Sequence, residues 1–268
     1  PENFSGLEKK HERLSFKDMW NTLKGNKPLQ CYIASAASDK LAQQTSTQEV
    51  IKTLLFGIII GDMGLSMILS VIAMFPSIAF AVVGAKYAGK HGSKKTIVVW
   101  SAISMIGAIV LLTFMTIIDP HNIPSSFLLK VVYVVLNTLW NGAKMCVTTA
   151  NTSFIADITD YELDRTGKYV PAVIAGTYSF VDKLISSFAA LVATGACALV
   201  GYHQTLPQPT DPYTPAIFWV TMGVFYGLPI IGWVITLIAM KGCKLDKDEM
   251  VEVQKRIAAK KAAMESEQ

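Results

Sequence analysis

Five long apolar segments constrain the fold of this chain more than any other feature. They are separated by short polar stretches and cover residues 65–84, 96–118, 127–149, 170–200 and 217–240. A helix needs about 20 mostly apolar residues to cross a bilayer, and each segment is long enough to do so. Only 16% of the 268 residues are charged, whereas about 25% are charged in an average soluble domain. The sequence therefore predicts an all-α polytopic membrane protein.

Basic residues occur in alternate connections between these segments. Lys and Arg are frequent before the first span, at 86–95, at 165–168 and after the last span, whereas 119–126 and 201–216 contain none. Because Lys and Arg accumulate on the cytoplasmic side of membrane proteins, both termini are predicted to be cytoplasmic. That orientation requires an even number of spans, so a sixth span must lie within residues 29–60.

The first part of this sixth span is polar. Lipid cannot satisfy polar side chains, so such a span must face protein or water. The alternative is an extramembrane helix followed by a short apolar anchor, which would leave six basic residues of the N-terminal segment on the outer face.

The predicted organisation is one bundle with two cytoplasmic extensions. Residues 1–28 are expected to form a linker that contains a short amphipathic helix after Ser15, and 242–268 a helical tail. The connections at 84–95 and 156–169 are expected to be cytoplasmic loops. The six spanning helices of the bundle at 29–241 are predicted near 29–59, 63–86, 94–118, 126–155, 170–201 and 214–241.

The sequence contains no motif for covalent or metal-dependent catalysis. The four cysteines are widely separated, and no His-Glu-x-x-His, P-loop or Gly-x-Ser-x-Gly pattern occurs. We therefore predict no enzymatic activity, no metal or resident cofactor, and no nucleic-acid partner. The chain begins at a proline, and we expect it to be a fragment of a longer protein.

Three lysines are predicted to lie deep inside the bilayer. Lys40, Lys144 and Lys183 each lie about 13 residues, or roughly 20 Å, from the cytoplasmic end of their spans. Asp39 and Asp182 are adjacent to two of these lysines. Ionisable side chains within a membrane are costly and mark substrate or ion paths by default. The alternative is that Asp–Lys pairs only lock helices together.

Each of the three spans that contain these lysines also has a polar face at helical spacing. Amines, carboxylates and amides can bind the hydroxyl groups of a sugar, and an aromatic ring can cover the apolar side of a pyranose. The predicted substrate site consists of Asp39, Lys40, Trp140, Asn141, Lys144, Thr148, Tyr178, Ser179, Asp182 and Lys183.

Short motifs then follow one another in a characteristic order. They are Asn26-Lys-Pro28, the Gly84–Lys95 connection, the Ala-Asp-Ile-Thr-Asp-Tyr run at 156–161, Thr166-Gly-Lys168 and Tyr178–Lys183. This order resembles that of the glycoside–pentoside–hexuronide:cation symporters, the melibiose permease family within the major facilitator superfamily. The resemblance covers nearly the whole chain but only the C-terminal six-helix half of that family's fold.

The resemblance implies symport of a sugar or glycoside with sodium or a proton by alternating access, the sugar binding between two six-helix halves. The cation site would lie in the absent N-terminal half. Lys183 matches the family's lysine in helix eleven. Tyr178 and Ser179 match polar positions near the sugar, although their residue types differ. Trp140 has no assured counterpart, since the family's tryptophan falls nearer Thr148.

The resemblance also implies a cytoplasmic gating or structural motif. It consists of Asp157, Asp160, Tyr161, Arg165, Gly84 and Gly92. The expected location is the bacterial cytoplasmic membrane, with membrane lipid as a partner. Two other functions stay open: the same fold with a lysolipid or another solute as cargo, and a six-span protein that dimerises into a carrier or channel.

Overall fold

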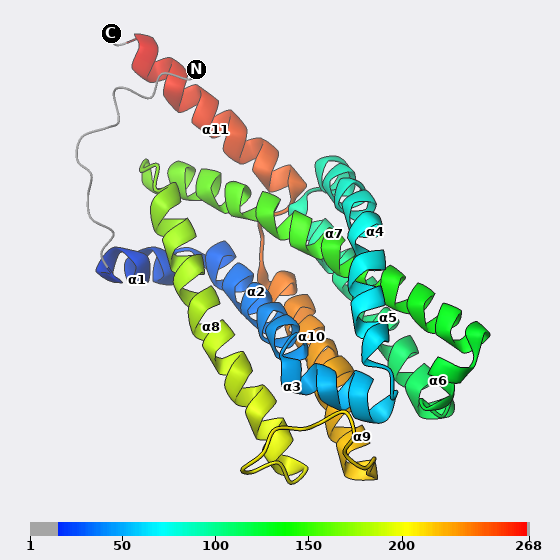
Figure 1. Ribbon diagram of the computed structural model, residues 1–268. Helices are drawn as coiled ribbons and strands as arrows, with labels where there is room; N and C mark the ends of the chain where they lie inside the picture. The colour runs from blue at the N-terminus through cyan, green and yellow to red at the C-terminus, as the bar shows by residue number, and fades with distance from the viewer. Residues whose placement is uncertain (1–15, 267–268) are drawn as a thin grey trace.

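The computed structural model describes residues 16–266, and the regular structure of this part of the chain is entirely helical (Figure 1). The helices are α1 (Phe16–Gly25), α2 (Lys27–Ser46), α3 (Glu49–Lys52), the π-helical η1 (Thr53–Ile59), α4 (Met63–His91), α5 (Ser93–Ile117), α6 (Asn122–Ser125), α7 (Phe127–Thr166), α8 (Pro171–Leu199), α9 (Pro215–Met222), the π-helical η2 (Gly223–Gly227), α10 (Leu228–Gly242) and α11 (Lys247–Ser266).

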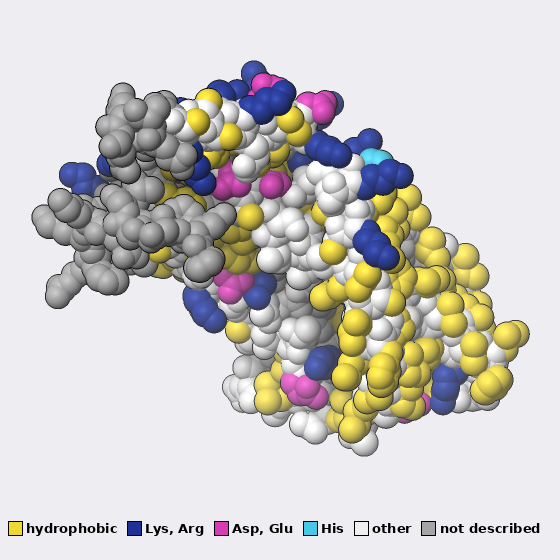
Figure 2. Space-filling view, turned by 90° about the horizontal axis from the view of Figure 1, so that it is seen from above, with side chains coloured by type: hydrophobic (Ala, Val, Ile, Leu, Met, Phe, Trp, Pro, Cys, Tyr) yellow, Lys and Arg dark blue, Asp and Glu magenta, His cyan; other side chains and the backbone are white. Residues whose placement is uncertain are grey.

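Four helical segments are long and apolar enough to cross a membrane. They are α4, α5, α8 and the continuous segment from α9 through η2 to α10. Their outward faces expose many apolar side chains, which form a broad hydrophobic surface in Figure 2. The prediction of an all-α polytopic membrane protein is confirmed. The segment from α2 to η1 and helix α7 carry the polar faces, and their membrane crossing stays a prediction.

Two helices organise the packing. Helix α7 lies against α4 and α5, whereas α2 lies against α8 and α10. Glycines permit the closest approach between α4 and α7. A Cβ atom on Gly84 would lie 2.8 Å from the Cα of Cys146, and one on Gly142 would lie 2.3 Å from the ring of Phe80. Larger residues at these two glycines would push the helices apart.

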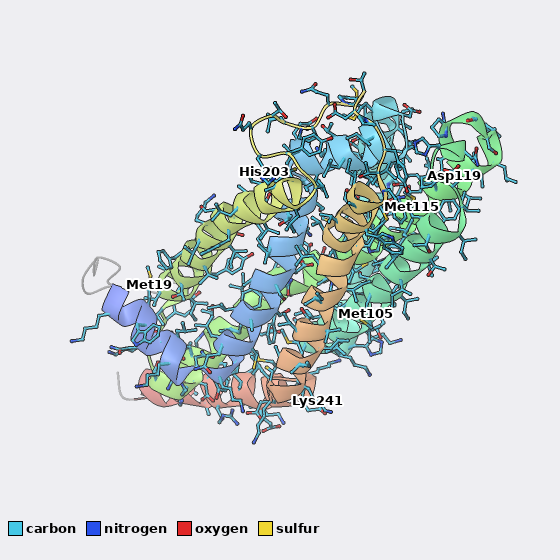
Figure 3. All side chains as sticks on the ribbon, turned by 90° about the horizontal axis from the view of Figure 1, so that it is seen from below. Met19, Met105, Met115, Asp119, His203 and Lys241 are labelled. Carbon is cyan, nitrogen blue, oxygen red and sulfur yellow. The ribbon has the colours of Figure 1, made fainter. Side chains whose placement is uncertain are left out.

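The outer and inner connections separate to opposite ends of the bundle. In Figure 3, Asp119 and His203 lie at one end, and Lys241 and Met19 lie toward the other. The basic connections and the arginine- and lysine-rich tail therefore share one end. Which end faces the cytoplasm stays a prediction.

The first predicted span is not one continuous helix. Helix α2 ends at Ser46, the chain turns at Thr47 and Gln48, and α3 and η1 complete the segment. The residues of η1 are all buried. The segment therefore has a polar first part in α2 and a wholly enclosed apolar second part.

The predicted loop at 156–169 is helical over most of its length, because α7 continues to Thr166. An ion pair between Glu162 and Arg165, 2.7 Å apart and one turn from each other, supports the last turns. The helix ends where Gly167 adopts a φ of +70°, a conformation that glycine adopts without strain.

Both predicted extensions contain a helix, α1 and α11, and their location outside the membrane stays a prediction. Ser15, the expected cap of α1, lies outside the described residues. In the tail, the Asp246 carboxylate accepts a hydrogen bond from the Glu249 amide at 3.0 Å and caps α11. Val253 and Ile257 are buried, so α11 packs on the bundle through its apolar stripe.

Candidate functional site

An ion pair joins α2 to α8 within the bundle. The Lys40 ammonium lies 3.0 Å from the Asp182 carboxylate, and the two side chains are 27% and 17% exposed. Helices α2 and α8 lie side by side along much of their length, which brings the two residues together. Because the pair is largely removed from water, each charge depends on the other for compensation.

The neighbouring Asp39 interacts with a different helix. Its carboxylate interacts electrostatically with Lys144 of α7 as well as with Lys40. The Lys144 ammonium also lies 3.8 Å from the centroid of the Trp140 ring, in a cation–π contact. Asp39, Lys40, Lys144 and Asp182 therefore form an alternating chain of charges across α7, α2 and α8.

The Trp140 ring supports this arrangement from within the core. Its indole nitrogen donates to the Ser104 carbonyl at 3.1 Å, and the rings of Tyr226 and Trp233 lie 5.5 and 6.2 Å away. Only 4% of Trp140 is exposed. Lys144 and the neighbouring aromatic rings cover much of the Trp140 ring, and its contact with a sugar stays a prediction.

Two small cavities adjoin the charged chain. The first, of about 150 Å³, is lined by Tyr32, Ala36, Asp39, Lys40, Gln43, Thr148, Asn151, Thr152, Ile155 and Tyr178. The second, of about 200 Å³, includes Asn137, Trp140, Asn141 and Lys144 in its lining. Pockets that enclose whole ligands measure about 300–1,000 Å³. Each of these cavities is therefore too small to enclose a whole ligand of that size.

Two tyrosines form the aromatic side of the first cavity. The Tyr178 and Tyr32 rings lie 5.3 Å apart, and Phe154 packs behind Tyr32 at 6.1 Å. Tyr32 was not among the predicted site residues. A signal for it exists in the sequence, because positions 32, 36, 39 and 43 share one face of a helix.

The structure separates two of the predicted residues from the others. Ser179 and Lys183 lie on the exposed face of α8 and line neither cavity. In the described part of the chain, no carboxylate forms an ion pair with Lys183. The remaining eight predicted residues line a cavity or belong to the charged chain.

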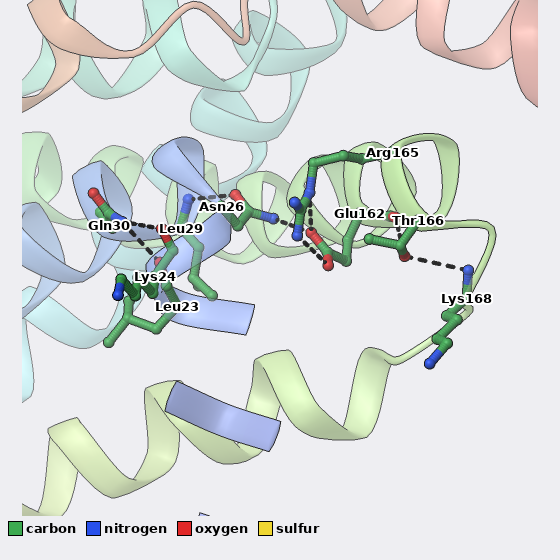
Figure 4. Close-up of polar contacts among 9 residues, drawn as sticks. All are labelled: Leu23, Lys24, Asn26, Leu29, Gln30, Glu162, Arg165, Thr166 and Lys168. Atoms are coloured by element: carbon green, nitrogen blue, oxygen red, sulfur yellow. Dashed lines mark hydrogen bonds and ion pairs between the residues drawn. The ribbon is translucent and has the colours of Figure 1, made fainter. Parts of the chain in front are cut away.

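The predicted cytoplasmic motif contacts the α1–α2 junction and helix α11, and Figure 4 draws the first of these contacts. Arg165 donates two hydrogen bonds to Glu162, at 2.7 and 3.1 Å, and Glu162 also accepts one from the buried Asn26 at 2.9 Å. Asp160 accepts from Gln254 of α11 at 2.7 Å. Asn26 was singled out only as part of a family motif, not as a site residue, and Glu162 was not predicted. The position of Asn26 just before Pro28, typical of a helix N-cap, is the signal that could have found Asn26.

Asp157 lines a groove of about 710 Å³ between α4, α7 and α11. Burial raises the pKa of this carboxyl, the Ser93 hydroxyl opposes the shift, and the charge of Asp160 adds to it. Tyr161 packs against the hydrophobic cluster that includes Phe154 and Ile158 of the same helix. Gly92 forms the α4–α5 turn with a φ of +87°, and a Cβ there would lie 3.0 Å from the Lys247 side chain. Gly92 and Gly84 are thus required by close packing.

A helical membrane bundle with charged and aromatic groups between its helices has the architecture of a membrane transporter. Residues 6–247 match the family model described as MFS/sugar transport protein. The chain belongs to this family, which makes it an integral membrane transporter and points away from an enzyme. No curated protein matches the chain.

Proposed function

We propose that the chain is the C-terminal half of a cation-coupled symporter of the glycoside–pentoside–hexuronide type. It would carry a sugar or glycoside by alternating access, with sodium or a proton as the coupling ion. The observation that carries this proposal is the alternating chain of Asp39, Lys40, Lys144 and Asp182 beside two polar cavities. A family of sugar transporters and a polar interior site favour a hydrophilic solute over a lysolipid.

Tyr178 is the aromatic ring best placed to contact a sugar. It lines the first cavity beside Asp39, Lys40 and Thr148, whereas Trp140, which lines the second cavity, is only 4% exposed. Carboxylate and ammonium groups can accept from and donate to sugar hydroxyls, and the phenol ring offers an apolar face. In this proposal Trp140 holds Lys144 in place, and Asn141 lines the second cavity next to it.

The exposed face of α8 supports the presence of a second half. Ser179, Lys183 and Ser187 recur every four residues on this face and are all exposed. A lysine facing lipid at this depth is unfavourable. We therefore propose that a second six-helix half, which would contain the cation site, covers this face, so that Lys183 faces the substrate path. A second copy of the chain could cover it in the same way.

The cytoplasmic residues would act in the change between states. Asp157, Asp160, Tyr161 and Arg165 lie where α7 meets α11 and the α1–α2 junction. We propose that their charge pairs break and form again as the cytoplasmic side opens and closes. We propose that both termini lie in the cytoplasm of a bacterial cell and that the bundle lies in its cytoplasmic membrane.

Uptake by membrane vesicles that contain the full-length carrier tests this proposal. Labelled glycosides, pentosides and hexuronides are supplied with a sodium gradient, with a proton gradient, or with neither. Accumulation of one sugar that depends on one gradient is the expected result and identifies the substrate and the ion. If no sugar accumulates although the protein is in the membrane, a lipid or another amphiphile becomes the better candidate for the cargo.

The variant Lys183→Ala tests the assignment of the α8 face. We expect it to abolish accumulation while the protein remains in the membrane, because Lys183 would face the path between the halves. The matched control is Lys255→Ala, which removes an exposed lysine from α11 and should transport normally. Normal uptake by the Lys183 variant would exclude this residue from the site.

A further inference from the structure

Seven lysines meet at one corner of the basic end of the bundle. This basic corner consists of Lys86, Lys90, Lys94 and Lys95 around the α4–α5 turn, and of Lys241, Lys244 and Lys247 between α10 and α11. Two contacts join the two segments. Lys247 donates from its ammonium group to the Lys90 carbonyl at 2.8 Å, and Lys94 donates in the same way to the Cys243 carbonyl.

The lysines of the basic corner lack acidic partners. In the described residues, no carboxylate forms an ion pair with any of the seven. Asp246 lies nearby, but its carboxylate caps α11. His91 adds to the crowding, since Lys95, Lys90 and Lys247 all interact electrostatically with it.

The far end of α11 shows the opposite arrangement. There Arg256 and Lys260 lie 2.7 and 2.9 Å from the carboxylate of Asp164, and Lys255 lies 2.7 Å from Glu252. The protein thus neutralises its cations at the end of α11 and leaves them uncompensated at the basic corner. Mutual repulsion at that corner would be relieved by an anion from outside the chain.

The surface next to the basic corner is apolar. Val82 and Val83 are exposed one turn before Lys86, and Ile238 is exposed one turn before Lys241. At 1.5 Å per residue, the lysines lie about 5 Å beyond these apolar side chains along their helices. In Figure 2, dark blue side chains border the hydrophobic surface on the side of the molecule where the basic end lies.

We propose that the basic corner binds the phosphate headgroup of an anionic phospholipid of the cytoplasmic leaflet. The acyl chains would lie against the exposed apolar faces of α4 and α10, and the lysines would surround the phosphate. A phospholipid matches both the lysines and the apolar faces beside them, whereas a soluble anion matches only the lysines. The proposal depends on the membrane location of the bundle and not on the identity of the transported solute.

The test measures binding of phosphatidylglycerol to the purified full-length protein by native mass spectrometry, with phosphatidylcholine as the zwitterionic reference. The variant Lys86→Gln/Lys90→Gln/Lys95→Gln removes three charges from the corner. We expect phosphatidylglycerol affinity to fall at least tenfold, since each lysine near an anionic lipid contributes about a fivefold factor. Phosphatidylcholine binding should not change.

The matched control is Lys24→Gln/Lys168→Gln/Lys255→Gln, which removes the same charge from exposed positions at the same end of the bundle. We expect its affinity to stay within twofold of the unaltered protein. Equal losses in both triple variants would overturn the proposal in favour of diffuse attraction to net charge. Competition by millimolar inorganic phosphate, with no preference for the lipid, would overturn the assignment to a phospholipid.

Discussion

At the residue scale, two adjacent side chains of α2 connect three helices. Consecutive residues of a helix point about 100° apart, so Asp39 interacts electrostatically with Lys144 of α7 while Lys40 forms an ion pair with Asp182 of α8. Loss of any one of these charges leaves its partner uncompensated in a site that is partly removed from water. The four residues therefore act as a unit rather than as independent contacts.

Lys40→Gln should destabilise the protein and reduce transport at least tenfold. Removing one partner of a fully buried ion pair costs about 3–5 kcal/mol. Here the side chains are 27% and 17% exposed, so water screens the loss and we expect a smaller effect, about 1–3 kcal/mol. Thermal unfolding and uptake measure the two effects. Lys255→Gln is the control, because the side chains of its ion pair with Glu252 are 67% and 54% exposed.

A charge exchange separates a binding role from a locking role. In Lys40→Asp/Asp182→Lys the ion pair can form again with reversed polarity, so thermal stability should return toward that of the unaltered protein. Transport should stay low, because the donors and acceptors offered to the substrate are interchanged. Recovery of both stability and transport would show that the pair only locks α2 to α8.

The charged residues of the site could be predicted because charges deep in apolar spans are conspicuous. Their orientation could not. Asp182 and Lys183 are adjacent, and the sequence does not determine which of them faces α2, because that depends on the rotation of α8 in the packed bundle. The surroundings of Trp140 could not be predicted either, because Lys144 lies over its ring and Tyr226 and Trp233 pack beside it. Tertiary packing decides both outcomes.

At the element scale, the extension of α7 provides the docking site of α11. Asp160 and Asp164 lie one turn apart, on the same side of the helix. Asp160 accepts a hydrogen bond from Gln254 of α11, and Asp164 accepts hydrogen bonds from Arg256 and Lys260. The sequence contains a signal for this extension that was missed. Positions 157, 160, 161 and 164 recur at helical spacing, although the run was expected to be a loop.

Asp164→Asn should release α11 from α7, because Arg256 and Lys260 lose the carboxylate that both contact. A spin label on Ala259→Cys, in a background without the native cysteines, would report this release as increased mobility of the label. Glu252→Gln, which alters an exposed pair within α11, is the control and should leave the label unchanged. Unchanged mobility in the Asp164 variant would show that the remaining contacts, which are the apolar stripe and the hydrogen bonds of Gln254 and Lys247, hold α11 without this ion pair.

The same contact predicts a pH dependence. Burial opposes ionisation of Asp164, but hydrogen bonds from Lys260 and Arg256 outweigh it and hold its pKa below the usual value. A carboxyl with a lowered pKa in the folded state contributes stability above its unfolded pKa, about 3.9, and loses it as the pH falls through the folded pKa. Mobility of the Ala259→Cys label should be constant from about pH 8 to pH 5 and rise below about pH 4. A transition near neutral pH would implicate another group.

At the scale of the whole molecule, hydropathy and charge distribution provide different information. Hydropathy identifies α4, α5, α8 and the α9–α10 segment. It does not identify the segment from α2 to η1, since polar groups lower the hydropathy of α2. Residues 127–149 of α7 were among the five apolar segments of the sequence, but α7 is not among these four helices because its polar face lowers its hydropathy. The distribution of basic residues indicated an even number of spans, which is how the polar segment at 29–60 entered the prediction. The break after Ser46 and the enclosure of η1 follow from packing and were not predictable.

The even number of spans predicts that both ends of the chain are labelled from the same side. Asn21→Cys in α1 and Ala259→Cys in α11 replace exposed residues of helices at the basic end, and His203→Cys replaces an exposed residue of the opposite loop. In a background without native cysteines, a membrane-impermeant maleimide should label His203→Cys in intact cells. The other two variants should be labelled only after permeabilisation, because the basic end would face the cytoplasm.

Each of the other labelling patterns would indicate a different membrane topology. Labelling of Asn21→Cys but not of Ala259→Cys in intact cells would mean an odd number of spans, and would remove the polar segment at 29–60 from the membrane. Labelling of both ends from outside would show that the orientation is inverted and that the number of spans is still even. The inverted case would place the seven lysines of the basic corner in the outer leaflet, so this experiment also decides which leaflet the proposed lipid site faces.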